Sequence, residues 1–176
     1  MKKILLTGGQ SSGKSSRAIE IADLCGEKKY FIATARRIDG ETSVKINRHI
    51  EERGNRYITV EEPLGVCDAL KGIIEKSPDI VVIDCITMWV SNLLIEREDK
   101  GYKDELENFL DYISGEEFSK TDSVLVMVTN EVGSGIIPMN ELGRKYCSLL
   151  GHTNKRIASV CDEVYLMACG LGVRLK

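Results

Sequence analysis

Residues 8–16 read GGQSSGKSS and come directly after a short apolar stretch. Gly8, Gly13, Lys14 and Ser15 satisfy the pattern GxxxxGK[ST], whose glycines let consecutive backbone N–H groups curl around a phosphate. The positive end of a helix expected to begin near Ser15 points to the same place. The alternative is a glycine-rich turn that binds nothing. The position between a strand and a helix favours a phosphate-binding loop, or P-loop.

Short apolar runs alternate with helical patterns along the chain. Strands are predicted at residues 4–7, 30–33, 80–84, 124–129 and 164–168, with a weaker strand at 57–60. Helices are predicted at 15–25, 41–53, 64–76, 87–97, 103–113 and 140–161, the last broken near Gly151. Continuous aliphatic strands separated by helices are typical of buried parallel sheets. We therefore predict an α/β, P-loop NTPase-like fold with a mostly parallel sheet flanked by helices on both faces, and ligands at the carboxyl ends of the strands.

Composition narrows the class of protein. The 176 residues suit one nucleotide-binding domain, residues 1–176, with one core. With 24 basic and 27 acidic residues the formal net charge is −3, without long runs of one sign, so no nucleic acid is expected as a partner. Six cysteines without CxxC or zinc spacing are expected to be buried thiols in a reducing compartment. The apolar run near the N-terminus is too short for a signal peptide, and no stretch has membrane-spanning length, so a cytoplasmic protein is expected.

The run IVVID, residues 80–84, ends in the candidate metal-binding acid. A P-loop that holds Mg²⁺ needs a second acidic group, commonly at the end of another buried strand, and Asp84 has that position. Ser15 would supply a hydroxyl ligand, and Lys14 would reach the β- and γ-phosphates. The alternative for Asp84 is an N-cap of the next helix. Residues 129–132, TNEV, are not the NKxD motif of GTPase switches, and the residues favour a phosphotransferase acting on a small molecule.

Residues 45–53, KINRHIEER, contain His49, one of two histidines in the chain. At helical spacing Lys45, His49 and Arg53 lie on one side, because residues four apart are neighbours. On these residues alone, a solvated basic stripe is the favoured interpretation.

Seven stretches resemble, in order, the bifunctional adenosylcobinamide kinase/adenosylcobinamide-phosphate guanylyltransferase family of cobalamin assembly: LLTGGQSSGKS, YFIATA, KINRHIEER, VEEP, VIDCITMWVSNLL, VTNEVGSGIIP and DEVYLMACGLGVRLK. The resemblance implies phosphorylation of the aminopropanol hydroxyl of adenosylcobinamide with ATP or GTP. It then implies transfer of GMP from GTP to that phosphate, giving adenosylcobinamide-GDP and pyrophosphate. Mg²⁺ as cofactor and a homo-oligomer such as a trimer are also expected.

The resemblance gives the KINRHIEER segment a second interpretation. In this family the histidine of an R/K-I-x-x-H-x-x-x-R frame becomes guanylylated, and Lys45, Ile46, His49 and Arg53 fill that frame here. A neutral imidazole can attack the α-phosphorus of GTP and expel pyrophosphate. Cations at Lys45 and Arg53 would disfavour protonated His49 and attract the triphosphate. His49 is therefore expected to be the nucleophile.

Further site residues are implied by matching segments. Lys14 and His49 are expected to be catalytic, and Ser15 and Asp84 to hold the metal. The expected nucleotide-binding residues are Gly8, Gly9, Gln10, Ser11, Ser12, Gly13, Lys14, Ser15, Ala33, Thr34, Ala35, Ile50, Glu51, Glu52, Arg53, Glu61 and Asp84. Glu61 has two alternatives: the role belongs to the adjoining Glu62, or Glu61 is a surface acid.

The chain departs from the family pattern at four of these positions. Many relatives have arginine where Ser11 stands, and basic residues where Ile50, Glu51 and Glu52 stand. The sequence therefore leaves open how tightly the chain binds nucleotide, which nucleotide it prefers and whether it retains both activities.

Other interpretations also stay open at this point. The chain could be a P-loop kinase of another metabolite that uses His49 only as a phosphate-binding cation, or a nucleotide-sensing binding protein. His152, in the expected helix break, is given no site role. Residues 129–138 are interpreted either as a wall of the site or as a plain connection. Trp89 is expected in the core or at a subunit interface rather than beneath a corrinoid.

Overall fold

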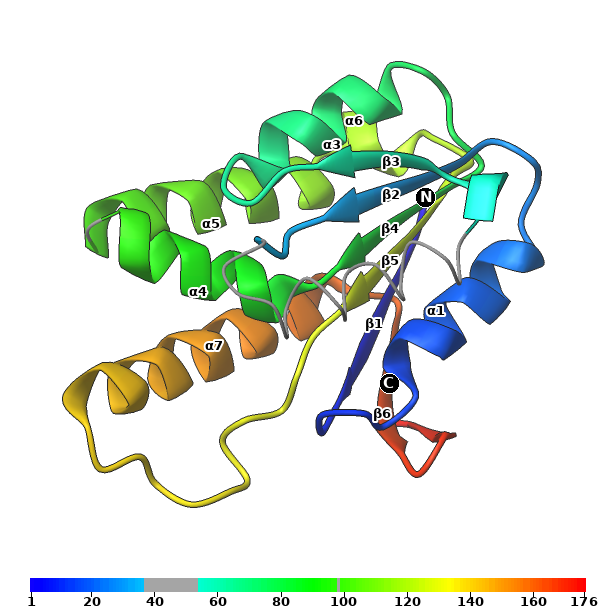
Figure 1. Ribbon diagram of the computed structural model, residues 1–176. Helices are drawn as coiled ribbons and strands as arrows, with labels where there is room; N and C mark the ends of the chain where they lie inside the picture. Colours follow the sequence, from blue (N-terminus) through cyan, green and yellow to red (C-terminus); the bar gives the residue numbers. More distant parts are fainter. Residues whose placement is uncertain (37–53, 98) are drawn as a thin grey trace.

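The computed structural model describes residues 1–36, 54–97 and 99–176, and its strands form one seven-stranded sheet (Figure 1). The strands are β1 (Lys2–Gly8), β2 (Lys29–Ala33), β3 (Ile58–Glu61), β4 (Ile80–Asp84), β5 (Val124–Val128), β6 (Glu163–Ala168) and β7 (Leu171–Arg174). The helices are α1 (Lys14–Asp23), the 3-10 turn η1 (Gly54–Arg56), α3 (Val66–Ile74), α4 (Ile86–Glu96), α5 (Asp99–Ser114), α6 (Glu116–Ser119) and α7 (Glu141–Val160). The helix predicted at 41–53 lies outside the described residues.

The order of the strands places the P-loop strand inside the sheet. The order is β3-β2-β4-β5-β1-β6-β7, and every neighbouring pair is parallel except β6 and β7. Strand β5 lies between β1 and β4, so the strands that end in the P-loop and in Asp84 are separated by one strand. The mostly parallel sheet is confirmed. The antiparallel β7 was not predicted, because its residues are exposed throughout and carry no buried apolar pattern.

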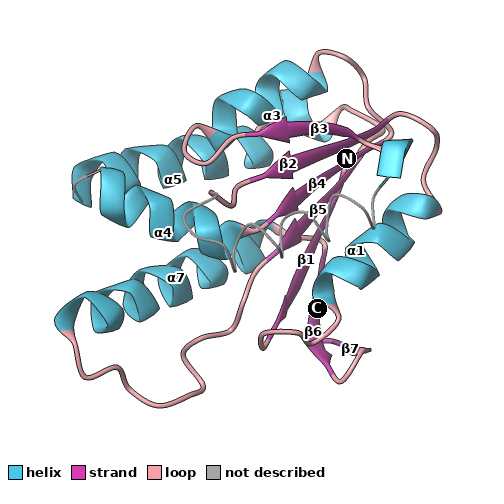
Figure 2. Ribbon diagram, viewed as in Figure 1, coloured by secondary structure: helices cyan, strands magenta, loops and turns pink. Residues whose placement is uncertain are grey.

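Helices cover both faces of the sheet, as predicted. On one face Ile32 and Ile83 belong to a core with residues of α3, α4, α5 and α7. On the other face Phe31 and Val82 pack with residues of α1. Figures 1 and 2 show α1 on one side of the sheet, opposite the layer that includes α4 and α7. Trp89 has 0% of its surface exposed, which confirms its prediction as a core residue.

Helix α7 corrects one prediction. It runs without interruption through Gly151, where a break was expected. Glycine costs about 1 kcal/mol in a helix interior relative to alanine, and the buried side chains Leu150, Thr153 and Ile157 anchor the helix on both sides of it. His152 therefore lies on an exposed helical position and not in a turn.

The cysteines correct a second prediction. All six are free thiols, and Cys67 and Cys161 are buried, but Cys169 in the turn between β6 and β7 is exposed. Cys25, Cys85 and Cys147 are half-buried, so the prediction of six buried thiols holds fully only at Cys67 and Cys161 and is wrong at Cys169. Within the described ranges, the helices include none that is both long and apolar enough to cross a membrane.

Candidate active site

The P-loop leaves β1 at Gly8 and enters α1 at Lys14. Gly8 has φ 148°, and a Cβ there would lie 2.3 Å from the carbonyl oxygen of Met167. Gly13 is the N-cap of α1 with φ 94°, a left-handed conformation that glycine adopts without a steric penalty. The glycines of the motif are therefore required by the backbone of this loop.

The turn between β6 and β7 supports the P-loop from outside. The N–H of Gly170 donates to the carbonyl oxygen of Ser12 at 3.1 Å. A Cβ on Gly13 would lie 3.0 Å from the Cα of Gly170, so the two backbones are in close contact. This support was missed from the sequence. Its only signal was the pair of glycines, Gly170 and Gly172, after the last predicted strand.

The side chain of Lys14 is buried inside the P-loop. Only 6% of its surface is exposed, and its ammonium donates to the carbonyl oxygen of Gly9 and to Oγ of Ser12, the latter at 3.3 Å. Burial lowers the pKa of Lys14, and the negative charge of Asp84 opposes that effect. The structure thus brings Lys14 and Asp84 within electrostatic reach of each other, at the carboxyl edge of the sheet.

Asp84 does not cap the helix that follows it. The N-cap of α4 is Cys85, which makes no side-chain capping hydrogen bond, so the capping alternative for Asp84 was wrong. Thr34 fixes this strand end: its hydroxyl donates to the carbonyl oxygen of Cys85 at 2.7 Å and accepts from the N–H of Cys85 at 2.8 Å. Burial raises the pKa of the Cys85 thiol to about 12, which keeps it neutral. The nucleotide contact of Thr34 stays a prediction, and its hydroxyl already makes two hydrogen bonds to the backbone of Cys85.

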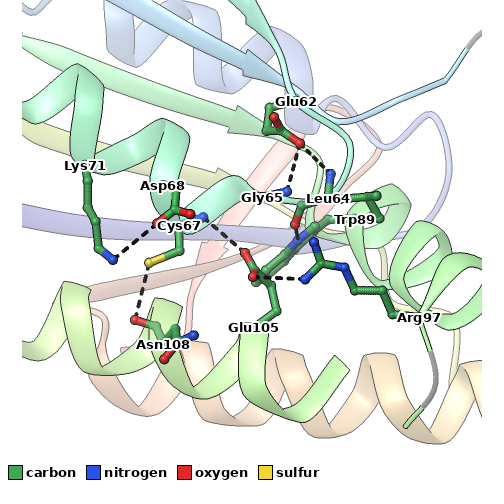
Figure 3. Close-up of polar contacts among 10 residues, drawn as sticks. All are labelled: Glu62, Leu64, Gly65, Cys67, Asp68, Lys71, Trp89, Arg97, Glu105 and Asn108. Carbon is green, nitrogen blue, oxygen red and sulfur yellow. Dashed lines mark hydrogen bonds and ion pairs between the residues drawn. The ribbon is translucent and has the colours of Figure 1, made fainter. Parts of the chain in front are cut away.

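Glu61 and Glu62 have different surroundings. Glu61 ends β3 beside Ala33 of β2, at the edge where the nucleotide is expected. The carboxylate of Glu62 instead accepts from the N–H groups of Leu64 and Gly65, at 2.9 and 2.8 Å, just before α3 (Figure 3). Among the described residues the Glu61 carboxylate has no hydrogen-bonding or ion-pair partner. This difference favours Glu61, and its binding role stays a prediction.

A buried polar network at the end of β5 was not predicted as such. The hydroxyls of Thr87 and Thr129 lie 3.4 Å apart, and Thr129 donates to Oδ1 of Asn154 at 2.7 Å. The phenol of Tyr146 donates to the carbonyl oxygen of Thr87 at 3.2 Å, and burial raises its pKa to about 12. The signal in the sequence was a polar pair, Thr129 and Asn130, directly after a buried strand.

The structure describes some of the predicted site residues but not all of them. The P-loop residues 8–15, residues 33–35, Glu61 and Asp84 lie at the carboxyl ends of β1, β2, β3 and β4. His49 and its frame residues Lys45 and Ile46, together with Ile50, Glu51, Glu52 and Arg53, lie outside the described residues. The first residues of segment 129–138 lie beside the P-loop, because the N–H of Glu131 donates to the carbonyl oxygen of Gly8 at 3.0 Å, and the interpretation of the segment as a wall of the site stays a prediction.

A sequence model of one protein family, described as "Cobinamide kinase / cobinamide phosphate guanyltransferase", matches residues 4–175. The chain belongs to this family. It is accordingly a transferase of cobalamin biosynthesis with kinase and guanylyltransferase activities, as the resemblance implied.

Curated relatives of this cobinamide kinase and guanylyltransferase match it from end to end. The bifunctional adenosylcobalamin biosynthesis protein CobP of Pseudomonas aeruginosa is 33% identical over 172 residues, which cover 98% of this chain and 96% of the relative. The bifunctional adenosylcobalamin biosynthesis protein CobU of Escherichia coli K12 is 32% identical over 185 residues, covering 98% of this chain and 99% of the relative.

Solved structures of low sequence identity share the fold of this cobinamide kinase and guanylyltransferase. An ATPase of a bacterial type III secretion system aligns with a TM-score of 0.59 at 10% identity, over 98% of this chain and 56% of that chain. A Pyrococcus horikoshii OT3 protein aligns with a TM-score of 0.58 at 6% identity, over 99% of this chain and 86% of that chain. At such identities the likeness concerns the fold alone, and the P-loop NTPase-like prediction is confirmed.

Proposed function

We propose that one nucleotide-binding domain, residues 1–176, phosphorylates adenosylcobinamide with ATP or GTP and then transfers GMP to the product by way of His49. The observation that carries this proposal is the buried Lys14 within reach of Asp84, in a chain whose residues 4–175 match a family of this double activity. The corrinoid and its phosphate are the proposed acceptors, and adenosylcobinamide-GDP and pyrophosphate are the final products.

The kinase step uses the P-loop as a rigid anion site. The hydroxyl oxygen of adenosylcobinamide attacks the γ-phosphorus, the bond from that phosphorus to the β–γ bridging oxygen breaks, and the hydroxyl proton is released. The Lys14 ammonium and the N–H groups of the loop stabilise the charge that accumulates on the phosphate oxygens. Because Gly8 and Gly13 are fixed against residues 167–170, these donors are already arranged before the nucleotide arrives.

Mg²⁺ is the proposed cofactor, and the residues fit its preferences. Mg²⁺ in kinase sites is held by one or two protein oxygens together with substrate phosphates and water. The Ser15 hydroxyl at the start of α1 and the Asp84 carboxylate at the end of β4 supply two such oxygens. When bound, the ion would neutralise charge on the phosphates.

The guanylyl transfer requires a nucleophile that can carry GMP. A ring nitrogen of neutral His49 attacks the α-phosphorus of GTP, forming a phosphorus–nitrogen bond as the bond to pyrophosphate breaks. A phosphate oxygen of adenosylcobinamide phosphate then attacks the same phosphorus, and the phosphorus–nitrogen bond breaks. Lys45 and Arg53 support the reaction by favouring neutral His49 and attracting the triphosphate.

We also propose a homo-oligomer, such as a trimer. The loop before α7 exposes Ile136 and Met139 at 95% and 98% of their surfaces, and large exposed apolar side chains in one segment are typical of contact surfaces. Figure 2 shows this connection between β5 and α7 extending away from the sheet. Analytical ultracentrifugation of the purified protein tests the assembly, and a monomer at micromolar concentration would contradict it.

Labelling with GTP that carries radioactivity at the α-phosphate tests the covalent step. Purified protein with Mg²⁺ is compared with His49→Ala and with a matched control, His152→Ala, which removes the exposed histidine of α7. We expect acid-labile protein-bound label on the wild type and the control and none on His49→Ala. Addition of adenosylcobinamide phosphate should discharge the label.

Absence of label from all three proteins, with GTP binding shown separately, would defeat the proposed transfer. Phosphorylation of adenosylcobinamide that persisted in such proteins would leave a kinase in which His49 binds phosphate only as a cation.

A further inference from the structure

Strand β5 ends between the two strands that carry the phosphate site. In the sheet register Val128 lies beside Leu6 of β1 on one side and beside Asp84 of β4 on the other. The residues that follow Val128 therefore reach the carboxyl edge between the P-loop and the proposed metal-binding acid. Asn130 is the second of them, and no role has been given to it so far.

The backbone on both sides of Asn130 is bonded to the strand that enters the P-loop. The N–H of Thr129 donates to the carbonyl oxygen of Leu6 at 2.9 Å, and the N–H of Glu131 donates to the carbonyl oxygen of Gly8 at 3.0 Å. Asn130 therefore lies alongside the first residues of the phosphate loop.

The peptide groups of Asn130 itself are also fixed. Its N–H donates to the hydroxyl of Thr87 at 2.6 Å, and its carbonyl oxygen accepts from Nδ2 of Asn154 at 3.1 Å. These partners belong to the buried network of α4 and α7, in which Thr129 is 0% exposed. A satisfied buried polar network is rigid, because each unpaired member would cost the free energy of its desolvation. The position of Asn130 is thus held from two helices and from β1.

The alternation of side chains assigns Asn130 to the face of the P-loop helix. Val128 packs in the core shared with α1, and Thr129 bonds across to Asn154 of α7 on the opposite face. Because successive side chains of an extended chain alternate between faces, Asn130 falls on the α1 side. Within the described ranges its carboxamide has no hydrogen-bonding partner, whereas its backbone groups are fully used.

We infer that the Asn130 carboxamide donates a hydrogen bond to the terminal phosphate of a nucleoside triphosphate held in the P-loop, and so distinguishes a triphosphate from a diphosphate. The inference rests on the proposed nucleotide site. A carboxamide suits this task because its two N–H donors bind a phosphate oxygen without adding a charge that would retain the product.

Calorimetric titration with GDP and with a non-hydrolysable GTP analogue, both with Mg²⁺, tests the inference. The proteins are the wild type, Asn130→Ala, Asn130→Asp and a control, Asn140→Ala. Asn140 accepts from the N–H of Gly143 at the start of α7, so the control loses stability in the same segment without touching the phosphate edge. For Asn130→Ala we expect the affinity for the analogue to fall about tenfold or more while that for GDP is unchanged, as for a lost hydrogen bond to a charged group. Asn130→Asp should lose more, because it places a negative charge beside the phosphate.

Two results would overturn the inference. Equal loss of affinity for both nucleotides in Asn130→Ala would show that the substitution distorts the loop as a whole, and no loss for either would show that the carboxamide makes no contact. The ratio of the two affinities decides the role of Asn130 independently of any corrinoid. Failure of the wild type to phosphorylate adenosylcobinamide, with nucleotide binding intact, would count against the proposed function alone.

Discussion

The N–H of Gly170 donates a hydrogen bond to the carbonyl oxygen of Ser12, so the turn of the β6–β7 hairpin lies directly on the phosphate loop. The contact depends on the backbone conformation of Gly170, whose φ of 80° would be strained for any residue with a side chain. Support of the loop by a distant hairpin has consequences that can be measured.

We predict that Gly170→Ala weakens nucleotide binding although no atom of residue 170 belongs to the P-loop. An L-residue at positive φ costs about 1–2 kcal/mol, and the turn can relieve that strain by leaving Ser12. Urea unfolding should show a loss of roughly that size, and calorimetry should show weaker GTP binding. Unchanged GTP affinity together with lowered stability would show that the loop keeps its shape without the hairpin.

The uninterrupted course of α7 predicts a stabilising substitution. An added Cβ at Gly151 meets no atom within 4 Å, and the residue is exposed in the middle of the helix. Gly151→Ala should therefore raise the free energy of unfolding by about 0.5–1 kcal/mol. A loss of stability, measured by urea unfolding, would indicate that the helix is broken at this point. Gly170→Ala, with the opposite expected sign, serves as the comparison.

Trp89 links the core to the loop before α3. Its ring is fully buried against Phe109, with centroids 5.2 Å apart. Its Nε1–H donates to the carbonyl oxygen of Leu64 at 2.8 Å (Figure 3). Trp89→Phe removes the donor and leaves unfilled volume, which should cost about 1–3 kcal/mol in urea unfolding. Leu24→Ala, at a position 89% exposed, should change stability by less than about 0.5 kcal/mol. Equal effects of the two substitutions would contradict the importance of the buried contact.

Glu105 gives stability a pH dependence of unusual sign. Burial raises the pKa of its carboxyl, although the N–H of Cys67 and the Arg97 guanidinium partly offset this effect (Figure 3). A carboxyl whose pKa is raised in the folded state lowers the free energy of unfolding as pH rises through the ordinary and the folded pKa, and the full cost remains at higher pH. We therefore expect the difference in melting temperature, Glu105→Gln minus wild type, to be more positive at pH 7 than at pH 4.

Glu107 provides the control of opposite sign. Its hydrogen bonds from Arg156 lower the pKa of its carboxyl, so its contribution to stability is present at neutral pH and is lost as pH falls. The difference in melting temperature, Glu107→Gln minus wild type, should accordingly be more negative at pH 7 than at pH 4. The same pH trend in both variants would contradict the assigned effects of burial and pairing.

Local chemistry explains what could be predicted from the sequence. The P-loop was predictable because Gly8, Gly13 and Lys14 lie in one short segment of the chain, and the backbone of that segment requires the two glycines. Strand β4 was predictable because a buried parallel strand is a continuous apolar run, and the metal-binding role of Asp84 at its end stays a prediction. Glu62 could not be separated from Glu61, because the distinction depends on the backbone N–H groups of the α3 start.

Contacts between distant segments explain what could not be predicted. The hydroxyls of Thr87 and Thr129 meet only after β5 enters the sheet beside β4, and nothing in either local sequence indicates the pairing. All residues of β7 are exposed, so burial does not specify this strand. It forms by antiparallel pairing with β6. The continuity of α7 through Gly151 likewise follows from burial of its neighbours and not from helix propensity.

The place of β1 in the sheet bears on how the enzyme is made. Both neighbours of β1, strands β5 and β6, come much later in the chain. While the ribosome is still adding residues, this apolar strand has two open edges, a condition that favours aggregation and chaperone capture. The same order means that a nascent chain acquires its nucleotide site only when the hairpin of β6 and β7 has emerged. Stalled chains of increasing length should therefore begin to retain GTP at that point and not when the P-loop itself leaves the exit tunnel.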